Sequence, residues 1–175
     1  RACTSGRGHV RARASALDYV GRTGAKYMSD QVVRVKIYQQ KDYRFESEFG
    51  DRIPTIVGDE PQPLGTGLGP SPVQLLCTAV GNCLASSLLF AFRKFKQDPD
   101  PLQCEVLASV GKNADNRLRV LSMKARITLG VATSALEHTD RVLDQFESFC
   151  TVTQSVRQSI PVEVSVYDDS GARLR

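Results

Sequence analysis

The sequence has 175 residues, of which 41% are hydrophobic and 24% charged, a composition typical of one globular, water-soluble domain. A domain of this size buries roughly two-thirds of its unfolded surface, so it needs neither disulfides nor a structural metal to form a core. The formal net charge of +4 arises in residues 1–30, which hold six basic and two acidic residues, whereas the rest holds 17 of each. The neutral remainder argues against a nucleic-acid-binding surface, so no nucleic acid is expected as a partner.

Five cysteines, an odd number, are spread over the chain. This pattern argues against a disulfide framework and favours a reducing compartment, so we expect a cytoplasmic protein. Residues 1–30 are rich in Arg, Ala, Ser and Gly, and we interpret them as a basic, flexible N-terminal extension, native or artificial. An organelle transit segment would have the same composition. The folded domain is expected over residues 31–175.

The first part of this domain has the alternating pattern of β-strands. Val33, Val35 and Ile37 alternate with basic residues and predict a strand over residues 31–39. Further strands are predicted over residues 43–49 and 53–57, which together would form a three-stranded meander. The Pro- and Gly-rich residues 58–69 are expected to form an ordered loop.

A long helix is predicted from residue 72 to about residue 96. Ser71 can cap it, Pro72 suits the first helical position, and Gln74 completes a capping box. Residues 75–92 include no charged side chain, which is typical of a membrane span or of a helix buried inside a protein. Interspersed polar residues and strand-rich flanks favour burial, so no membrane is expected as a partner. A helix buried on all sides needs a second subunit to cover it, which predicts a homodimer.

The remaining elements follow in short succession. Strands are predicted over residues 104–110 and 123–129, joined by a turn at residues 113–116 into a hairpin. A second capping-box pattern, Ser134 to Glu137, predicts a helix that runs to about Phe149. Its apolar stripe consists of Leu136, Leu143, Phe146 and Cys150. A short helix over residues 152–159 and a last strand over residues 162–166 are expected before the ordered structure ends at residues 168–171.

The cysteines differ in what their positions indicate. A buried cysteine is generally an inert small hydrophobe, and Cys104 fits this interpretation as an inward-facing strand residue. Cys77 and Cys83 lie about 120° apart around one helix and cannot form an ordinary pair. Without a CxxC spacing, neither a zinc site nor a thioredoxin motif is expected, so no metal is predicted. The two histidines, His9 and His138, are interpreted as surface groups.

Two cysteines could meet in the folded domain. Cys83 lies in the middle of the long helix beside small residues that allow another element to approach closely. Cys150 ends the apolar stripe of the second helix, and the long helix is the obvious partner for that stripe.

Several short motifs, in order, resemble the OsmC and organic hydroperoxide resistance family. The resemblance covers residues 31 to about 167, and Asp59-Glu60-Pro61 with Gly65 is similar to one subgroup. Its motifs are Gly69-Pro70-Ser71-Pro72, Leu75-Leu76, Ala79, Gly81-Asn82-Cys83, Phe149-Cys150-Thr151-Val152 and Ile160-Pro161-Val162-Glu163-Val164.

The resemblance implies an α+β, OsmC-like fold in which antiparallel sheets wrap around long central helices of an intertwined homodimer. It further implies two active sites at the subunit interface, with Cys83 as the peroxidatic thiolate and Cys150 as the resolving cysteine. The expected partners are a hydroperoxide substrate and an external dithiol reductant, and no cofactor is expected.

Peroxidases of the family activate the first cysteine with an Arg held by a Glu ten residues before that cysteine, a position occupied here by Val73. A cation is needed because burial in an apolar helix raises the pKa of a thiol. Glu60 or Asp59 are candidate replacements for the carboxylate, and Arg44 or Arg52 for the cation. The substrate pocket is expected to be lined by Leu76, Val80 and Phe146.

The sequence therefore predicts a thiol-dependent peroxidase that reduces organic hydroperoxides through a sulfenic acid and then a disulfide. The alternative is a non-catalytic OsmC-like dimer that binds an apolar ligand or acts as a redox-responsive partner, which Val73 favours. A disulfide oxidoreductase acting on other thiols would use the same cysteine pair.

Overall fold

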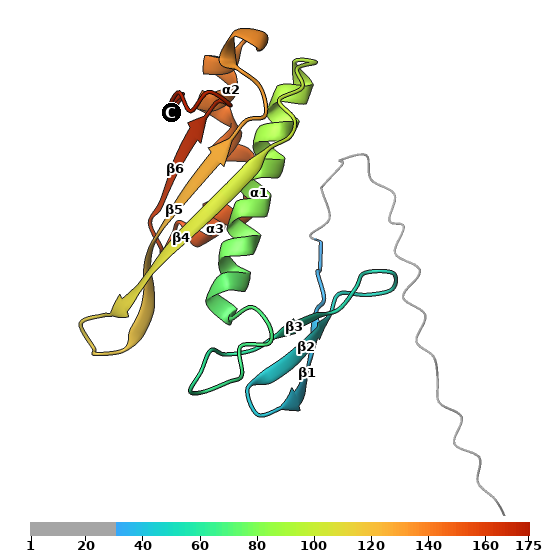
Figure 1. Ribbon diagram of the computed structural model, residues 1–175, viewed down its shortest axis with the longest axis vertical. Coiled ribbons are helices and arrows are strands. Elements are labelled where there is room, and N and C mark those ends of the chain that lie inside the picture. Colours follow the sequence, from blue (N-terminus) through green and yellow to red (C-terminus); the bar gives the residue numbers. More distant parts are fainter. Residues whose placement is uncertain (1–30) are drawn as a thin grey trace, which may run out of the picture. The chain divides into compact units, whose positions relative to one another are not determined.

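The order of elements gives the predicted α+β fold, and its six strands form two three-stranded sheets (Figure 1). The computed structural model describes residues 31–175, so the expected extension at residues 1–30 lies outside the described residues. The strands are β1 (Lys36–Lys41), β2 (Arg44–Glu48), β3 (Ile56–Gly58), β4 (Gln103–Lys112), β5 (Leu118–Thr128) and β6 (Val162–Tyr167). The helices are α1 (Pro72–Lys94), α2 (Thr139–Gln145) and α3 (Thr151–Val156), with 3₁₀ turns η1 (Thr133–Ala135) and η2 (Phe146–Phe149).

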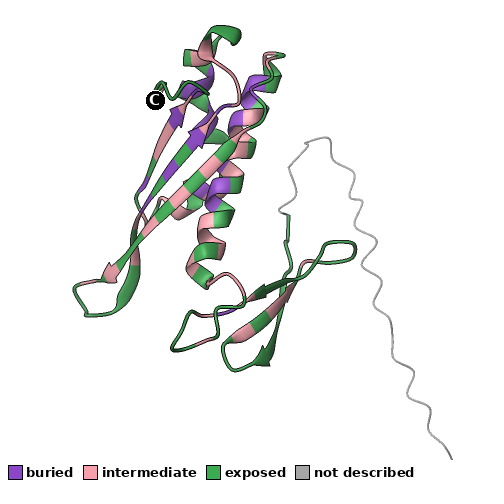
Figure 2. Cartoon of the chain, in the orientation of Figure 1, coloured by how far each residue is buried: buried purple, intermediate pink, exposed green. Residues whose placement is uncertain are grey.

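The first sheet is the predicted antiparallel meander, β1-β2-β3. Its first strand begins at Lys36 and its third at Ile56, each later than the alternation predicts. The sheet carries apolar side chains that remain exposed in the single chain, among them Ile37 at 63% and Phe45 at 39%. In Figure 2 these strands are mainly exposed or intermediate. One chain alone therefore leaves this sheet without a complete core.

The second sheet has the order β4-β5-β6 and is mixed. β4 and β5 form the predicted hairpin, and Asn113 Oδ1 accepts hydrogen bonds from the backbone amides of Asp115 and Arg117 in the turn. β6 pairs with β5 in parallel, so the expectation that the sheets are antiparallel is wrong here. The chain crosses through η1, α2, η2 and α3 before it returns, and such a connection allows a parallel strand.

Helix α1 begins as predicted. The Ser71 Oγ accepts the backbone amide of Gln74 at 3.4 Å, and the Gln74 Oε1 accepts that of Ser71 at 2.8 Å, which completes the capping box. The helix is long and apolar enough for a membrane span by length and composition, as core helices also can be. One stripe is fully buried, whereas Phe90 is 63% exposed, so a single chain covers only one side of α1 (Figure 2). This stripe consists of Val80, Leu84, Leu88 and Phe92.

The prediction of one continuous helix up to Phe149 is wrong, because this part of the chain forms three short elements, η1, α2 and η2. Leu136 is extended and His138 has a left-handed backbone, with φ of 58°. The backbone amide of Glu137 donates to Gln97 Oε1 at 3.0 Å, so a tertiary contact replaces the expected capping box. The apolar stripe nevertheless packs inward, since Phe146 and Cys150 are fully buried.

The ordered structure continues past residues 168–171, contrary to the sequence prediction. Asp168 is buried, and its Oδ1 accepts hydrogen bonds from Ser170 and from the backbone amide of Ala172. Its Oδ2 accepts the Thr133 backbone amide at 3.2 Å and the Thr133 hydroxyl at 2.9 Å. These hydrogen bonds hold the pKa of Asp168 well below its usual range, and the bond from the Ser170 hydroxyl has the largest effect. One carboxylate thus ties the end of β6 to η1.

Replacement of this carboxylate makes the first prediction. Asp168→Asn places an amide NH₂ where one oxygen accepts hydrogen bonds, so the variant should unfold at a lower temperature at neutral pH. Because folding lowers the pKa of Asp168, its contribution to stability is fully present well above 3.8 and is lost as the pH falls below that value. The difference in Tm between the two proteins should therefore shrink in acid. A difference that stays constant from neutral to acidic pH would contradict this assignment.

Candidate functional site

The structure brings the thiols of Cys83 and Cys150 together. Cys83 lies in the middle of α1 and is half-buried, whereas Cys150 is fully buried between η2 and α3, which both pack against α1. Cys83 lies close enough to Cys150 to raise the pKa of its thiol, and both belong to the same packed core. Both cysteines are free thiols. Two neighbouring reduced thiols can be oxidised to a disulfide.

Two features of the sequence place Cys150 at this point. Phe146 and Leu143 anchor the preceding segment in the core, and Cys150 is the residue at which the chain turns from η2 into α3. On α1, Cys83 directly precedes Leu84 of the fully buried stripe, so its side chain lies at the edge of the packed face. Core packing therefore determines which thiols meet.

A buried acidic residue stabilises the turn that carries Cys150. The Glu147 carboxylate, in a side chain that is 11% exposed, pairs with Arg157 at 2.5 Å and with Arg175 at 2.8 Å. The Arg157 guanidinium also donates to the Val162 carbonyl at 3.0 Å, and Gln154 Nε2 donates to the Glu147 carbonyl at 2.9 Å. The ion pair links η2 to the end of α3, and the bond from Arg157 to Val162 links both to β6. Both charges of the Glu147–Arg157 pair are partly sheltered from water. Sequence reasoning missed this network, whose partners lie in three separate elements.

The environment of Cys150 favours the protonated thiol. Burial raises the pKa of Cys150 above its ordinary value of 9.0, and the hydrogen bond and charge of Cys83 raise it further. The Thr153 side chain and backbone amide act in the opposite direction. Cys150 is therefore a neutral thiol near neutral pH, and the less buried Cys83 is the one that a solute can reach first.

The predicted activating groups lie elsewhere in the described chain. Arg44 is half-buried on β2, and its Nε is hidden from solvent without a hydrogen-bond partner among residues 31–175. Arg52 is exposed in the turn after β2, and Glu60 is half-buried in the loop before α1. The groups that shift the pKa of Cys150 are Cys83 and Thr153, and none of the predicted groups is among them. Their role in activation stays a prediction.

The predicted pocket residues pack in the interior. Val80 and Phe146 are fully buried in the core cluster, and Leu76 is half-buried against it. They belong to, or pack against, the same core as Cys150. Whether they contact a substrate stays a prediction.

Asp59, considered above as a replacement carboxylate, instead organises its own loop. Its Oδ2 accepts the Thr66 hydroxyl at 2.5 Å and the Leu68 amide at 3.2 Å, and its Oδ1 accepts the Glu60 amide at 2.9 Å. The hydrogen bond from Thr66 is the main cause that lowers the pKa of Asp59. A Cβ at Gly65 would lie 2.4 Å from Asp59 Oδ1, so only glycine fits there. The loop that leads into α1 is therefore built around this buried carboxylate.

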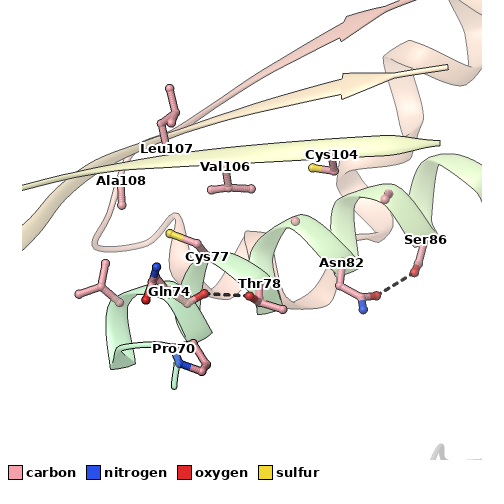
Figure 3. A pocket seen from close by; sticks show the side chains of 13 residues that line it. Pro70, Gln74, Cys77, Thr78, Asn82, Ser86, Cys104, Val106, Leu107 and Ala108 are labelled. Carbon is pink, nitrogen blue, oxygen red and sulfur yellow. Dashed lines mark hydrogen bonds between the residues drawn. The ribbon is translucent and has the colours of Figure 1, made fainter. Parts of the chain in front are cut away.

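The other two described cysteines line a hollow of about 870 Å³ between α1 and β4 (Figure 3). Cys77 approaches it from the helix and Cys104 from the strand. Burial raises the pKa of both thiols. A Cβ at Gly81 would lie 2.9 Å from Val106 Cγ2 and 3.4 Å from Cys104 Sγ, so this small residue permits the close packing of α1 on β4. Sequence reasoning missed this hollow, although uncharged polar residues recur along α1 at four-residue intervals: Gln74, Thr78, Asn82 and Ser86.

No three His, Cys, Asp or Glu side chains gather within residues 31–175 in a way that could hold a metal ion. The expected absence of metal and cofactor stays a prediction. The chemistry available at the Cys83–Cys150 pair is the reversible, two-electron oxidation of two thiols.

Comparison with known proteins gives a consistent match. The sequence model of the OsmC-like protein family matches residues 65–165, more than half of the chain. A search of curated proteins finds no match. Structural similarity is found with an osmotic stress and detoxification response protein of Psychrobacter arcticus 273-4, at 22% identity and a TM-score of 0.66, covering 81% of this chain and 100% of the other.

Two further similar structures are organic hydroperoxide resistance proteins. The OsmC protein of Legionella pneumophila is 14% identical, with a TM-score of 0.61 and coverage of 78% of this chain and 96% of the other. OhrB of Bacillus subtilis is 15% identical, with a TM-score of 0.61 and coverage of 78% and 98%. At these identities the structural similarity concerns the fold.

The different exposure of the paired thiols gives the second prediction. During a brief treatment of the reduced protein with iodoacetamide near neutral pH, Cys83 should be alkylated well before Cys150, because Cys150 is fully buried and its pKa is raised. Alkylation of Cys150 should accelerate only as the pH rises above 9.0. Peptide mapping by mass spectrometry measures both rates. Equal or faster labelling of Cys150 near neutral pH would contradict the described site.

Proposed function

The chain belongs to the OsmC-like protein family, and we propose that it is a thiol-dependent peroxidase that reduces organic hydroperoxides through Cys83 and Cys150. The observation that carries this proposal is the placement of two reduced thiols, one half-buried and one fully buried, as neighbours in the same packed core. The organic hydroperoxide resistance proteins among the similar structures support it. The reducing chemistry of the cycle suits the cytoplasm, which we propose as its location.

The proposed cycle has three steps. The Cys83 thiolate attacks one oxygen of the hydroperoxide, so that an S–O bond forms, the O–O bond breaks, and the alcohol leaves after it takes up a proton. Cys83 is then a sulfenic acid. The Cys150 sulfur attacks the Cys83 sulfur, the disulfide forms, and the hydroxide of the sulfenic acid leaves as water with the proton of Cys150. An external dithiol then reduces the disulfide by exchange.

The environments of the two cysteines support this division of roles. Cys83 is the more exposed of the two and can be reached by a peroxide, whereas Cys150 is fully buried with Cys83 as its neighbouring thiol. A neutral, buried Cys150 resists direct oxidation, since the thiolate is the reactive form of cysteine. It therefore remains available to trap the sulfenic acid.

We further propose that the working unit is a homodimer that provides the missing parts of the site. In the single chain, the first sheet and part of α1 leave large apolar side chains exposed. Burial of these surfaces by a second copy would provide the driving force for association. It would also bring new charged groups towards Cys83, and Arg44, Arg52 and Glu60 are the proposed sources of activation in place of the Glu that Val73 replaces.

The third prediction tests the peroxidase activity. Reduced protein mixed with cumene hydroperoxide should consume it rapidly and lose two thiols per chain. Cys83→Ser should abolish consumption, because it removes the attacking sulfur, whereas Cys150→Ser should stop at a sulfenic acid that dimedone traps. Cys104→Ser provides the matched control, since Cys104 lines the hollow between α1 and β4 and not the Cys83–Cys150 site. This variant should consume peroxide at the wild-type rate.

Three outcomes separate this proposal from its alternatives. Thiols that survive excess cumene hydroperoxide would exclude the peroxidase and leave a non-catalytic dimer that binds an apolar ligand or acts as a redox-responsive partner. Rapid oxidation of the pair by protein disulfides but not by peroxide would indicate a disulfide oxidoreductase. Faster reaction with hydrogen peroxide than with cumene hydroperoxide would contradict the preference for organic substrates.

The fourth prediction concerns the dimer. Sedimentation equilibrium should give twice the chain mass of 19.2 kDa. Phe90→Glu places a charge on the exposed side of α1 and should weaken association, because an unpaired charge would become buried in the interface. Lys112→Glu, at the exposed end of β4, is the control for a charge change elsewhere. A wild-type protein that sediments as a monomer at micromolar concentration would exclude the proposed assembly.

A further inference from the structure

We propose that Thr153 is a positioning residue for the resolving step, in which its hydroxyl orients the Cys150 sulfur and stabilises the thiolate as that sulfur attacks Cys83. The inference rests on the proposed function, since it assigns a residue to the second step of that cycle. It is carried by a buried hydrogen bond between Cys150 and a side chain that core packing alone does not explain.

The geometry is specific. The Cys150 Sγ donates to the Thr153 Oγ1 at 3.0 Å, and both residues are fully buried. Thr153 lies in the first turn of α3, three residues after Cys150, so the helix fixes the distance between the hydroxyl and the sulfur. Water does not reach either group, so the groups of this segment that act on the sulfur are the hydroxyl and the backbone amide of Thr153.

Two other helical hydroxyls in the described chain bond to the backbone instead. The Ser155 hydroxyl donates to the Thr151 carbonyl at 2.9 Å, and the Thr78 hydroxyl donates to the Gln74 carbonyl at 2.9 Å. Bonding to the carbonyl four residues earlier is the usual choice for such side chains in helices. Thr153 instead meets the sulfur of the proposed resolving cysteine.

A hydroxyl can serve both protonation states of the sulfur. It accepts the S–H hydrogen while Cys150 is a thiol, and it can rotate to donate its own hydrogen once Cys150 is a thiolate. In the resolving step the Cys150 proton leaves with the hydroxide of the Cys83 sulfenic acid as water, and negative charge develops on the Cys150 sulfur as its proton departs. A donor fixed at hydrogen-bonding distance stabilises that charge throughout the step.

The other groups around Cys150 leave this role to Thr153. From α1 the facing titratable group is Cys83, whose charge opposes the Cys150 thiolate. On the same segment, Glu147 is paired with Arg157 and Arg175. Thr153 lowers the pKa of Cys150 against the effects of burial and of Cys83.

The test compares Thr153→Val, which removes the hydroxyl and keeps the shape, with Thr153→Ser, which keeps the hydroxyl and removes a methyl group. In single-turnover experiments with cumene hydroperoxide, sulfenic acid should form on Cys83 at the wild-type rate in both variants. The disulfide should form about tenfold more slowly in Thr153→Val, the factor that corresponds to the loss of one strong hydrogen bond to a charged sulfur. Thr153→Ser should stay within about twofold of the wild type, because its hydroxyl can make the same bond.

The pH dependence of the resolving rate distinguishes the two roles, because a purely structural role of Thr153 would leave it unchanged. The rise of the resolving rate with pH should shift upward by about one unit in Thr153→Val, since a tenfold loss of thiolate stabilisation corresponds to one pKa unit. A slower resolving step in Thr153→Ser, with a wild-type rate and unchanged pH dependence in Thr153→Val, would assign the effect to packing of the methyl group and overturn the proposal. Thr153→Ala is a second variant without the hydroxyl, and it should show the same upward shift.

A measurement without peroxide separates this inference from the proposed function. The ¹³Cβ chemical shift of labelled Cys150 is followed by NMR as a function of pH in two proteins. One carries Cys83→Ser alone, and the other carries Cys83→Ser together with Thr153→Val. The pKa of Cys150 should be higher in the Thr153→Val protein whether or not the wild type reduces peroxides. Identical titration curves would overturn the role of Thr153, whereas a higher pKa in a protein that leaves peroxide intact would overturn only the peroxidase.

Discussion

The candidate site depends on the packing of the segment before Cys150 against helix α1. Phe146 and Leu143 bury their side chains in the same core as the stripe of α1 that includes Leu84, and Cys83 lies directly beside Leu84. The apolar contacts therefore place the two cysteines as neighbours, and the ion pairs of Glu147 stabilise the turn into α3. Packing and ion pairs of this kind hold both cysteines in place, which favours formation of a disulfide between them.

The single chain provides the sulfur chemistry but leaves its activation incomplete. A thiolate in an apolar environment needs a cation or several hydrogen-bond donors, and no cation is among the groups that shift the pKa of Cys150. Val73 stands where the resemblance to the family's peroxidases implies a Glu, so the proposed activation of Cys83 would use other residues. The exposed apolar surface of the first sheet indicates how they could arrive, because a second copy that covers this surface would carry its own charged loops.

The sequence predicted the parts that depend on local patterns. Ser71 and Gln74 form the expected capping box, the β4–β5 hairpin is present, and the stripe through Phe146 packs inward. The failures have tertiary causes. The Gln97 side chain accepts a hydrogen bond from the backbone amide of Glu137, where the sequence predicted a continuous helix. Asp168 holds residues 168–171 in an ordered conformation, although their composition predicted the end of the ordered structure. For the site, small neighbours of Cys83 and the stripe of Cys150 indicated that the thiols could meet, whereas the Glu147 network and Thr153 required the fold.

The central claim is that α1 packing selects Cys83 and Cys150 as the pair that oxidises together. The most direct test is to treat the reduced protein with one equivalent of diamide, which oxidises thiols without peroxide chemistry, and to map the disulfides by mass spectrometry after digestion. The structure predicts a dominant peptide pair that links Cys83 to Cys150 within one chain. A dominant link between Cys77 and Cys104, or between Cys83 and any partner other than Cys150, would contradict the account.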